Sequence, residues 1–495
     1  MLPLAATATA VRKAGLAHWA ARVLEECDKA NDSFAADPVH DLRVAIRRCR
    51  SMADGFRSVD PDPAWKQMKR LAKPLFASLG DLRDTQVMLE WVSKLSEQDD
   101  GLGQELTAAL GQKEIQLKAA AKDAVAAFDR KHWVSLNDHL APRTNAVPLE
   151  GPVFQHLALE RWMEARQLHR RALRNRSSAA WHQLRIGIKR FRYTVENFLP
   201  QRHESWSRDL RDLQDALGDV HDLDVLRTLI NSHPADDRGY KAGWLRRIAQ
   251  ERHRRLEMYR SKMVGRGSLW EVWRAGLPGG VELEHAGLQK LRTWASFLDP
   301  DLRHSDLVAA LALALYDGLV HCGIFAPAPR ERQLLEAAAI LHEIGRSKGS
   351  GGHQKRGERM VAKLAPPLGW SEEDMRCLAA LVRFHRGPLP KPGNSAFVGV
   401  ERKRRAELLR LMGVLRLANA LDESHRGTLR EFTVSRTNEA IVVKVRGLRR
   451  MSRDAERIAR ARYLLETICR RPVQLCGWRA PRKAAPTRRR AARAS

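Results

Sequence analysis

The chain has 495 residues, enough for two or three domains, and its hydrophobic content of 44% argues against wholesale disorder. Lysine and arginine number 87 against 58 acidic residues, and the formal net charge is +29. Such an excess is typical of proteins that bind a polyanion, whether nucleic acid, a membrane surface or a phosphate polymer. No stretch approaches the roughly 18 apolar residues of a membrane helix, and the six cysteines form no C-x-x-C pair. We therefore expect a cytoplasmic protein with reduced thiols and no membrane span.

Two basic helices are predicted early in the chain. Residues 39–57 have one apolar face and one cationic face at helical spacing. The cationic face contains His40, Arg43, Arg47 and Arg50. After a turn at residues 60–63, residues 65–92 form the second helix, which Pro74 should kink or restart. Its basic face contains Lys66, Lys69, Arg70 and Lys73.

Both helices occur a second time. Residues 181–199 repeat residues 39–57 without a gap, and residues 208–230 repeat much of the second helix, including its Leu-Gly-Asp motif. The copied cationic residues are His182, Arg185, Lys189, Arg190 and Arg192, followed by Arg208 and Arg211. The pattern predicts a tandem duplication of antiparallel helical bundles, about 1–145 and 150–279, and a mainly α fold.

A single amphipathic helix with a charged face is usually just solvated, but two copies in the same phase favour an anion-binding surface. The histidines could instead cap or pack at the helix starts. We interpret the aspartates of the repeated L-G-D-x-x-D motif as partners that orient arginines rather than as catalytic acids.

The paired signatures H-x-x-R-[VI]-x-x-[RK]-R and L-G-D-x-x-D resemble the CHAD domain, the conserved-histidine α-helical domain. The resemblance covers about residues 10–279, so we predict a CHAD-like domain over 1–279. It implies two pseudo-symmetric bundles around a basic groove that binds inorganic polyphosphate through the cationic residues named above. The chemistry agrees, because a phosphate chain offers dense charge and no base to read, and arginine forks match phosphate oxygens.

The composition changes at residues 277–280, Leu-Pro-Gly-Gly, which we interpret as a linker. A second, mostly helical domain is expected over 285–475, with a β-hairpin in the alternating residues 429–447. Residues 479–495 are basic and contain proline, so we expect a disordered tail that could bind nucleic acid nonspecifically.

The blocks L-H-E-I-G, R-F-H-R-G and L-R-L-A-N-A-L-D resemble the HD-type C-terminal domain of the exopolyphosphatase/guanosine pentaphosphatase family. The resemblance implies mainly part of a polyphosphate-binding channel. That family's phosphohydrolase chemistry lies in N-terminal domains with glycine-rich loops, which we expect to be absent here. The order of histidines and carboxylates also matches an HD metal site, which could hold a divalent metal and activate water. The candidate ligands are His304, His342, Glu343, His385 and Asp422.

Three features argue against that metal site. Glu343 replaces the usual aspartate, Arg356 occupies the second histidine position of a motif that begins at His353, and the surroundings are basic. The leading hypothesis is therefore a polyphosphate-binding protein, which could act at a storage granule. The alternative is a metal-dependent HD phosphohydrolase acting on polyphosphate or phosphorylated nucleotides. Nucleic-acid binding is a third hypothesis, but the basic faces carry few aromatic residues for base stacking.

Overall fold

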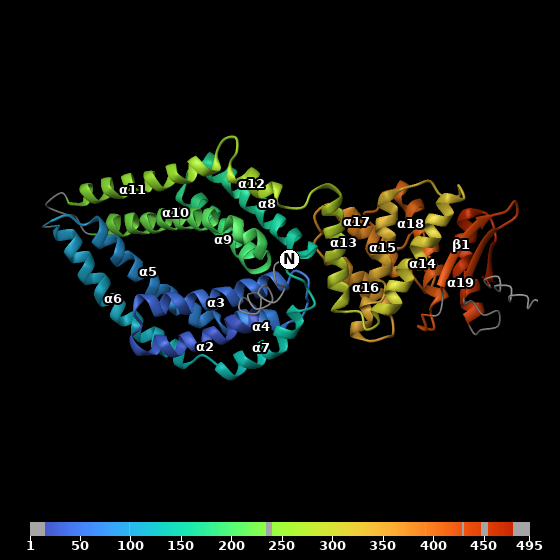
Figure 1. Cartoon of the computed structure of the whole chain (residues 1–495), viewed down its shortest axis with the longest axis horizontal. Helices are drawn as coiled ribbons and strands as arrows, with labels where there is room; N and C mark the ends of the chain where they lie inside the picture. Colours follow the sequence, from blue (N-terminus) through green and yellow to red (C-terminus); the bar gives the residue numbers. More distant parts are fainter. Residues whose placement is uncertain are drawn as a thin grey trace, which may run out of the picture. The chain divides into compact units, whose positions relative to one another are not determined.

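A computed structural model describes residues 15–98, 100–233, 240–391, 393–427, 430–446 and 454–478. The chain divides into two compact units, residues 1–294 (the first unit) and 295–495 (the second unit). Helices dominate both, and the described strands form a single small sheet in the second unit (Figure 1). The predicted mainly α class is thus confirmed. Over the described ranges, no helix combines the length and apolarity needed to cross a membrane.

The first copy of the duplication builds one half of the first unit. Its helices are α2 (Leu16–Ser33), α3 (Ala36–Phe56), α4 (Ala64–Leu71), α5 (Lys73–Leu95), α6 (Gly101–Ala126) and α7 (Arg130–Thr144). Helix α3 buries the apolar face that includes Leu42 and Ile46, both fully shielded from solvent. Pro74 occupies the first turn of α5, where its missing N–H costs no helical hydrogen bond, so the chain breaks between α4 and α5 as predicted.

The second copy repeats this order with one difference. Its helices are α8 (Pro152–Asn175), α9 (Ser178–Phe198), α10 (Pro200–Ser232), α11 (Tyr240–Met263) and α12 (Leu269–Ala275), and α13 (Gly280–Ser296) follows. Helix α9 corresponds to α3. Helix α10 is continuous over the span that α4 and α5 divide, because Asp212 stands where the first copy has Pro74.

The two copies share a core. Helix α3 packs beside α9, and α5 packs beside α10. The matched residues Phe56 and Phe198 meet edge to face with ring centroids 5.5 Å apart. A separate part of the shared core buries Trp91 and Leu102 of the first copy together with Leu223 and Trp244 of the second. Because this shared core fixes α3 against α9, the two basic faces are held in a defined relation.

The second unit is a helical bundle with a small sheet. Its elements are α14 (Leu302–His321), α15 (Pro329–Leu341), η1 (Ile344–Lys348), α16 (His353–Val361), α17 (Glu372–Phe384), η2 (Ser395–Phe397), α18 (Arg402–Leu421) and α19 (Asp454–Cys469). Helix α14 packs against α15 and α18, and α17 packs against α15, α16 and α18. The C-terminal half of α18 is buried along its whole circumference, which makes it the centre of the bundle.

The predicted β-hairpin is present as β1 (Arg430–Arg436) and β2 (Ile441–Arg446), which pair antiparallel. A third strand, β3 (Val473–Trp478), pairs parallel with β2 and was not predicted. The crossover between β2 and β3 contains α19, the kind of connection that parallel strands require. The predicted tail at residues 479–495 lies outside the described residues.

Candidate functional site

The basic faces of α3 and α9 converge on a central basic cluster, which consists of Arg43, Arg47, Arg185, Lys189 and Arg192. The guanidinium carbon of Arg47 lies 5.4 Å from the ring centroid of Tyr193, and that of Arg192 lies 5.9 Å from the same ring. One tyrosine of α9 therefore contacts arginines from both copies. Its hydroxyl is buried without a hydrogen bond.

The pKa of Lys189 reflects how close these cations lie to one another. Burial, together with the charges of Arg47, Arg185 and Arg43, lowers the pKa of Lys189 to about 7. A lysine pKa falls this far where burial removes water from the charged form and neighbouring cations outweigh the nearest carboxylate. The cluster is thus a partly buried site of strong positive potential.

Direct ion pairs are scarce in the central basic cluster. Within the described part of the chain, no ion pair involves Arg43, Arg47, Arg185 or Lys189, whereas Arg192 lies 3.8 Å from Glu196. Asp84 is the carboxylate whose charge acts on both Arg43 and Lys189. Adjacent cations without paired carboxylates repel one another, so an external anion would stabilise this arrangement.

Arg43 and Arg50 both cover Phe76 of α5. Their guanidinium carbons lie 5.0 and 4.9 Å from the centroid of that ring, and Arg43 Nη1 donates to Phe76 O over 3.4 Å. The Nη1 atom of Arg50 is buried without a hydrogen bond. The two aromatic rings beside the cluster, Phe76 and Tyr193, are therefore each already in contact with two arginines.

Two predicted residues have partners outside the cluster. Arg190 Nη1 lies 2.6 Å from Glu164 of α8, and Lys69 pairs with Asp54 of α3. A further group is exposed on α3, α4, α5 and α10, namely His40, Lys66, Arg70, Lys73, Arg208 and Arg211.

His182 contacts a residue that the sequence did not single out. Its Nδ1 lies 3.2 Å from Nδ1 of His221 in α10, and the two ring centroids are 4.4 Å apart. Burial lowers the pKa of both imidazoles, that of His221 to about 4. Of the motif aspartates, Asp219 pairs with Arg255 of α11, outside the cluster. Burial raises the pKa of Asp222 to about 6.

The second unit contains a buried histidine cluster at one end of its bundle, where several helices begin or end. His304 is in the first turn of α14, and His353 is the first residue of α16. His342 and His385 are the C-cap residues of α15 and α17. All four side chains are at most 5% exposed. The four histidines lie at helix ends, where backbone N–H and C=O groups lack helical partners and side chains can bond to them.

Three of these histidines have a defined tautomer. Nδ1 of His342, His353 and His385 lies 2.7, 2.9 and 2.8 Å from the carbonyl oxygens of Ala339, Ser350 and Val382. A carbonyl only accepts, so each Nδ1 carries the proton. Burial lowers the pKa of His342 to about 3 and also lowers that of His385, which keeps these two rings neutral. Their Nε2 atoms are therefore lone-pair acceptors.

Glu343 joins the histidines into two groups that could each hold a metal ion, His304–His342–Glu343 and Glu343–His353–His385. His353, which the candidate ligand set omitted, lies with its Nε2 3.2 Å from Glu343 Oε1. Asn419 is also new, with Oδ1 3.1 Å from His304 Nε2 and 3.2 Å from His342 Nε2. Of the predicted ligands, the structure brings together His304, His342, Glu343 and His385.

Asp422 belongs to neither group of candidate metal ligands and contacts His304 instead. Its Oδ2 is 2.9 Å from Nδ1 of His304, so it orients that ring. Burial disfavours the charged imidazole, but the hydrogen bond and the charge of Asp422 outweigh it and raise the pKa of His304. Arg356 was one of the features that argued against a metal site. Its guanidinium donates to the carbonyls of Gly345, Gly349 and Gly351 and so stabilises the loop before α16.

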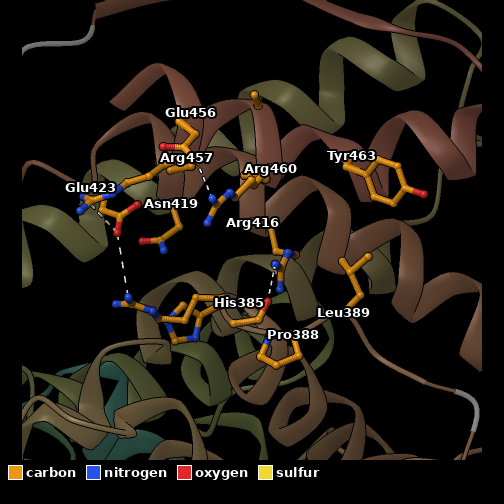
Figure 2. Close-up of a pocket in the computed structure, with 15 residues that line it drawn as sticks. His385, Pro388, Leu389, Arg416, Asn419, Glu423, Glu456, Arg457, Arg460 and Tyr463 are labelled. Carbon is orange, nitrogen blue, oxygen red and sulfur yellow. Dashed lines mark hydrogen bonds and ion pairs between the residues drawn. The ribbon is translucent and has the colours of Figure 1, made fainter. Parts of the chain in front are cut away.

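A cavity of about 830 Å³ opens onto this cluster (Figure 2). His385 and Asn419 line its inner side, and Arg416 binds the carbonyls of Phe384 and Gly387 beside them. The remaining charged lining residues are Arg386, Glu423, Glu456, Arg457 and Arg460. Arg386 and Arg457 lie 4.0 and 3.4 Å from Glu423, and Arg460 lies 2.5 Å from Glu456, so these three arginines already have carboxylate partners.

The fold and these two sites define a mainly α protein that combines a duplicated basic helix pair with a buried histidine bundle. Comparison with family models assigns both parts. The CHAD domain model matches residues 11–231, and the model for the Ppx/GppA phosphatase, domain III, matches residues 291–450. The chain thus contains one stretch that matches the CHAD domain and a second that matches Ppx/GppA domain III, and the two matches point to a function related to polyphosphate. A comparison with curated proteins finds no match.

Proposed function

We propose that the protein binds inorganic polyphosphate at the central basic cluster of its CHAD domain. The observation that carries the proposal is the gathering of Arg43, Arg47, Arg185 and Lys189, half-buried and outside any described ion pair. Successive phosphates of a chain would supply the missing negative charge through charge-assisted hydrogen bonds. The exposed cations on α4, α5 and α10 would contact the chain where it leaves the cluster.

The aromatic residues favour polyphosphate over nucleic acid. Single-stranded nucleic acids bind by stacking bases on free aromatic faces. Here Phe76 and Tyr193 are each in contact with two arginines, which occupy the faces a base would need. Phosphate contacts alone remain, and they suit a ligand that consists only of phosphates. Such binding could take place at a cytoplasmic polyphosphate granule.

The test is a titration of the full chain with polyphosphate at several salt concentrations. The affinity should fall steeply with salt, because cations that neutralise phosphates release counterions. Arg43→Glu combined with Arg185→Glu should weaken binding at least ~100-fold, since each lost charged contact is worth about 1.5–3 kcal/mol. Duplex DNA should compete poorly.

A matched control variant distinguishes the effect of the central basic cluster on affinity from the effect of net charge. Lys113→Glu combined with Lys122→Glu changes the net charge by the same amount on the exposed surface of α6. This pair should change the affinity only a few-fold. Equal losses in both double variants would show that the overall charge, and not the central basic cluster, holds the ligand.

A further inference from the structure

The last aspartates of the two L-G-D-x-x-D motifs, Asp84 of α5 and Asp222 of α10, lie beside the central basic cluster. The charge of Asp84 acts on Arg43 and Lys189, and the charge of Arg185 acts on Asp222. Burial raises the pKa of Asp222 to about 6, and the charge of Asp84 contributes to that rise. The two carboxylates are thus near each other, and we call their part of the cluster the acidic side.

These two aspartates differ from the first aspartate of the second motif. Asp219 pairs with Arg255 of α11. Within the described ranges, neither Asp84 nor Asp222 forms an ion pair or a side-chain hydrogen bond. An aspartate that serves only to orient an arginine would contact one. The charges of Asp84 and Asp222 therefore remain available to act on a ligand.

Cations occupy the opposite, basic side of the cluster. Lys73 precedes Asp84 by eleven residues, and Arg211 precedes Asp222 by the same number. Eleven residues make about three helical turns, so cation and aspartate share a helix face and lie about 16 Å apart along the axis. The two helices point the same way, since the C-terminal half of α5 shares a core with that of α10 (Figure 1). Both cations thus lie at one side and both carboxylates at the other.

The positive charge continues outward on the basic side. Arg70 of α4 and Arg208 of α10 are exposed there, at positions matched by the duplication. Asp215 lies on the same face of α10, but the charges of Arg192 and Arg211 act on it and compensate its own. The potential along the cluster is therefore directional: positive on the basic side and opposed by two carboxylates on the acidic side.

We propose that the central basic cluster binds the end of a polyphosphate chain, with the terminal phosphate on Arg43, Arg185 and Lys189 and with Asp84 and Asp222 beyond it. The rest of the chain leaves across the basic side. This inference rests on the proposed function and adds the part of the polymer that is recognised. Asp84 and Asp222 are specificity-determining residues, because they repel any phosphate that would continue past the cluster.

The charges of the two kinds of phosphate support an end-on arrangement. An interior phosphate has one ionised oxygen, whereas a terminal phosphate has close to two near pH 7, as a phosphorylated side chain does. The more highly charged group matches the place where three cations meet. A chain that passed through the cluster would instead bring further phosphates against the two carboxylates, where like charges repel.

The test compares polyphosphate that has free ends with polyphosphate of the same length whose two terminal phosphates are capped as methylphosphoramidates. Capping removes one ionised oxygen at each end and leaves the interior unchanged. The full chain at physiological salt should bind the free-ended polymer at least ~10-fold more tightly, the equivalent of about one charged hydrogen bond. With protein in excess, light scattering should count at most two protein chains per polymer, whatever the polymer length.

Asp84→Asn combined with Asp222→Asn should reduce this discrimination below threefold and bind the capped polymer more tightly than the wild type does. The reason is that a neutral amide no longer repels a continuing chain. The matched control is Asp219→Asn combined with Asp123→Asn, which changes the net charge equally at the partner of Arg255 and on the exposed surface of α6. The control should keep the full discrimination.

Equal affinity of the wild type for the two polymers would overturn the proposal, and so would a bound number that grows with polymer length. The same loss of discrimination in both double variants would also overturn it. Circular dichroism checks folding, and if a variant does not fold, the wild-type affinities and the count still decide. Failure of the proposed function looks different, because binding of either polymer would then not depend on Arg43 and Arg185.

Discussion

Gly80 of α5 lies against the guanidinium of Arg43 in α3. A Cβ atom at position 80 would stand 2.8 Å from Arg43 Nη1, closer than atoms in contact normally approach. The duplicated position is looser, because a Cβ on Gly218 would stand 3.9 Å from Arg185 Nε, an ordinary contact. A Cβ atom at position 80 would therefore displace the Arg43 guanidinium, whereas the matched position in the second copy has room for one.

Gly80→Ala should displace Arg43 and weaken polyphosphate binding about tenfold, the loss of roughly one charged hydrogen bond. Gly218→Ala should leave the affinity unchanged and raise the free energy of unfolding by about 0.5–1 kcal/mol, because alanine favours a helix interior over glycine. Polyphosphate titration and urea unfolding measure the two effects. If both variants lose affinity equally, the close approach at Gly80 has no role in binding.

Lys189 should make polyphosphate binding depend on pH. Its pKa of about 7 leaves it mostly neutral at pH 8, and a bound phosphate chain favours the charged form. Binding should therefore take up to about one proton, and the affinity should fall about tenfold from pH 7 to pH 9. Calorimetry in buffers of different ionisation enthalpy measures the proton uptake.

Between pH 7 and pH 9 the charge of Lys189 changes, whereas the charges of its titratable neighbours do not. Partial loss of hydration and neighbouring cations lower the pKa values of His40 and His182, so both stay neutral above pH 7, and Asp222, with a pKa of about 6, stays charged. Lys189→Arg places there the residue found at the matched position 47, which does not titrate. This variant should bind without proton uptake. Persistent uptake in Lys189→Arg would assign the proton to another group.

The neighbours Arg190 and Arg192 should differ in effect. Arg192 belongs to the central basic cluster, whereas Arg190 pairs with Glu164 of α8. Arg192→Gln should weaken polyphosphate binding about tenfold or more. Arg190→Gln removes the same charge and should change affinity less than threefold, with a stability loss below about 1 kcal/mol because the pair is exposed. Polyphosphate titration distinguishes them, and a larger effect at Arg190 would contradict the proposed binding face.

The sequence was sufficient for the features that depend on local pattern. Helical periodicity and the gapless repeat predicted the mainly α fold and its duplication, and Pro74 predicted the break between α4 and α5. The order His304, His342 and His385 along the chain marked residues that the fold brings together. Each of these signals depends on spacing, and spacing is visible in one sequence.

The sequence could not supply what depends on packing between distant helices. Arg190 has the same local pattern as Arg192, and only the course of α8 places Glu164 beside it. Arg356 was interpreted as a cation near the metal ligands, but its guanidinium fastens a glycine-rich loop whose path no pattern reveals. Strand β3 is separated from β2 by α19, so its pairing leaves no hairpin signature.

The ion pair between buried Asp60 and partly exposed Arg143 should contribute to the stability of the first unit. Asp60, 1% exposed, accepts hydrogen bonds from Trp65 Nε1 at 2.8 Å and from Nε and Nη2 of Arg143, both at 2.7 Å. Asp60→Ala leaves the indole N–H and the guanidinium without this partner. We expect the free energy of unfolding to fall by about 1–3 kcal/mol, because the buried indole N–H loses its acceptor, whereas Arg143 is partly exposed and still lies 3.6 Å from Asp62.

The control is a second ion pair of α7, the helix that contains Arg143. Arg130 of α7 pairs with Asp28 over 2.6 Å, but both side chains are exposed. Asp28→Ala should cost less than about 1 kcal/mol, since water replaces the lost contact. Urea unfolding followed by tryptophan fluorescence measures both, and most tryptophans report on the first unit. Similar losses in the two variants would mean that α7 is held by its apolar contacts, including the buried Trp133, and not by the Asp60–Arg143 pair.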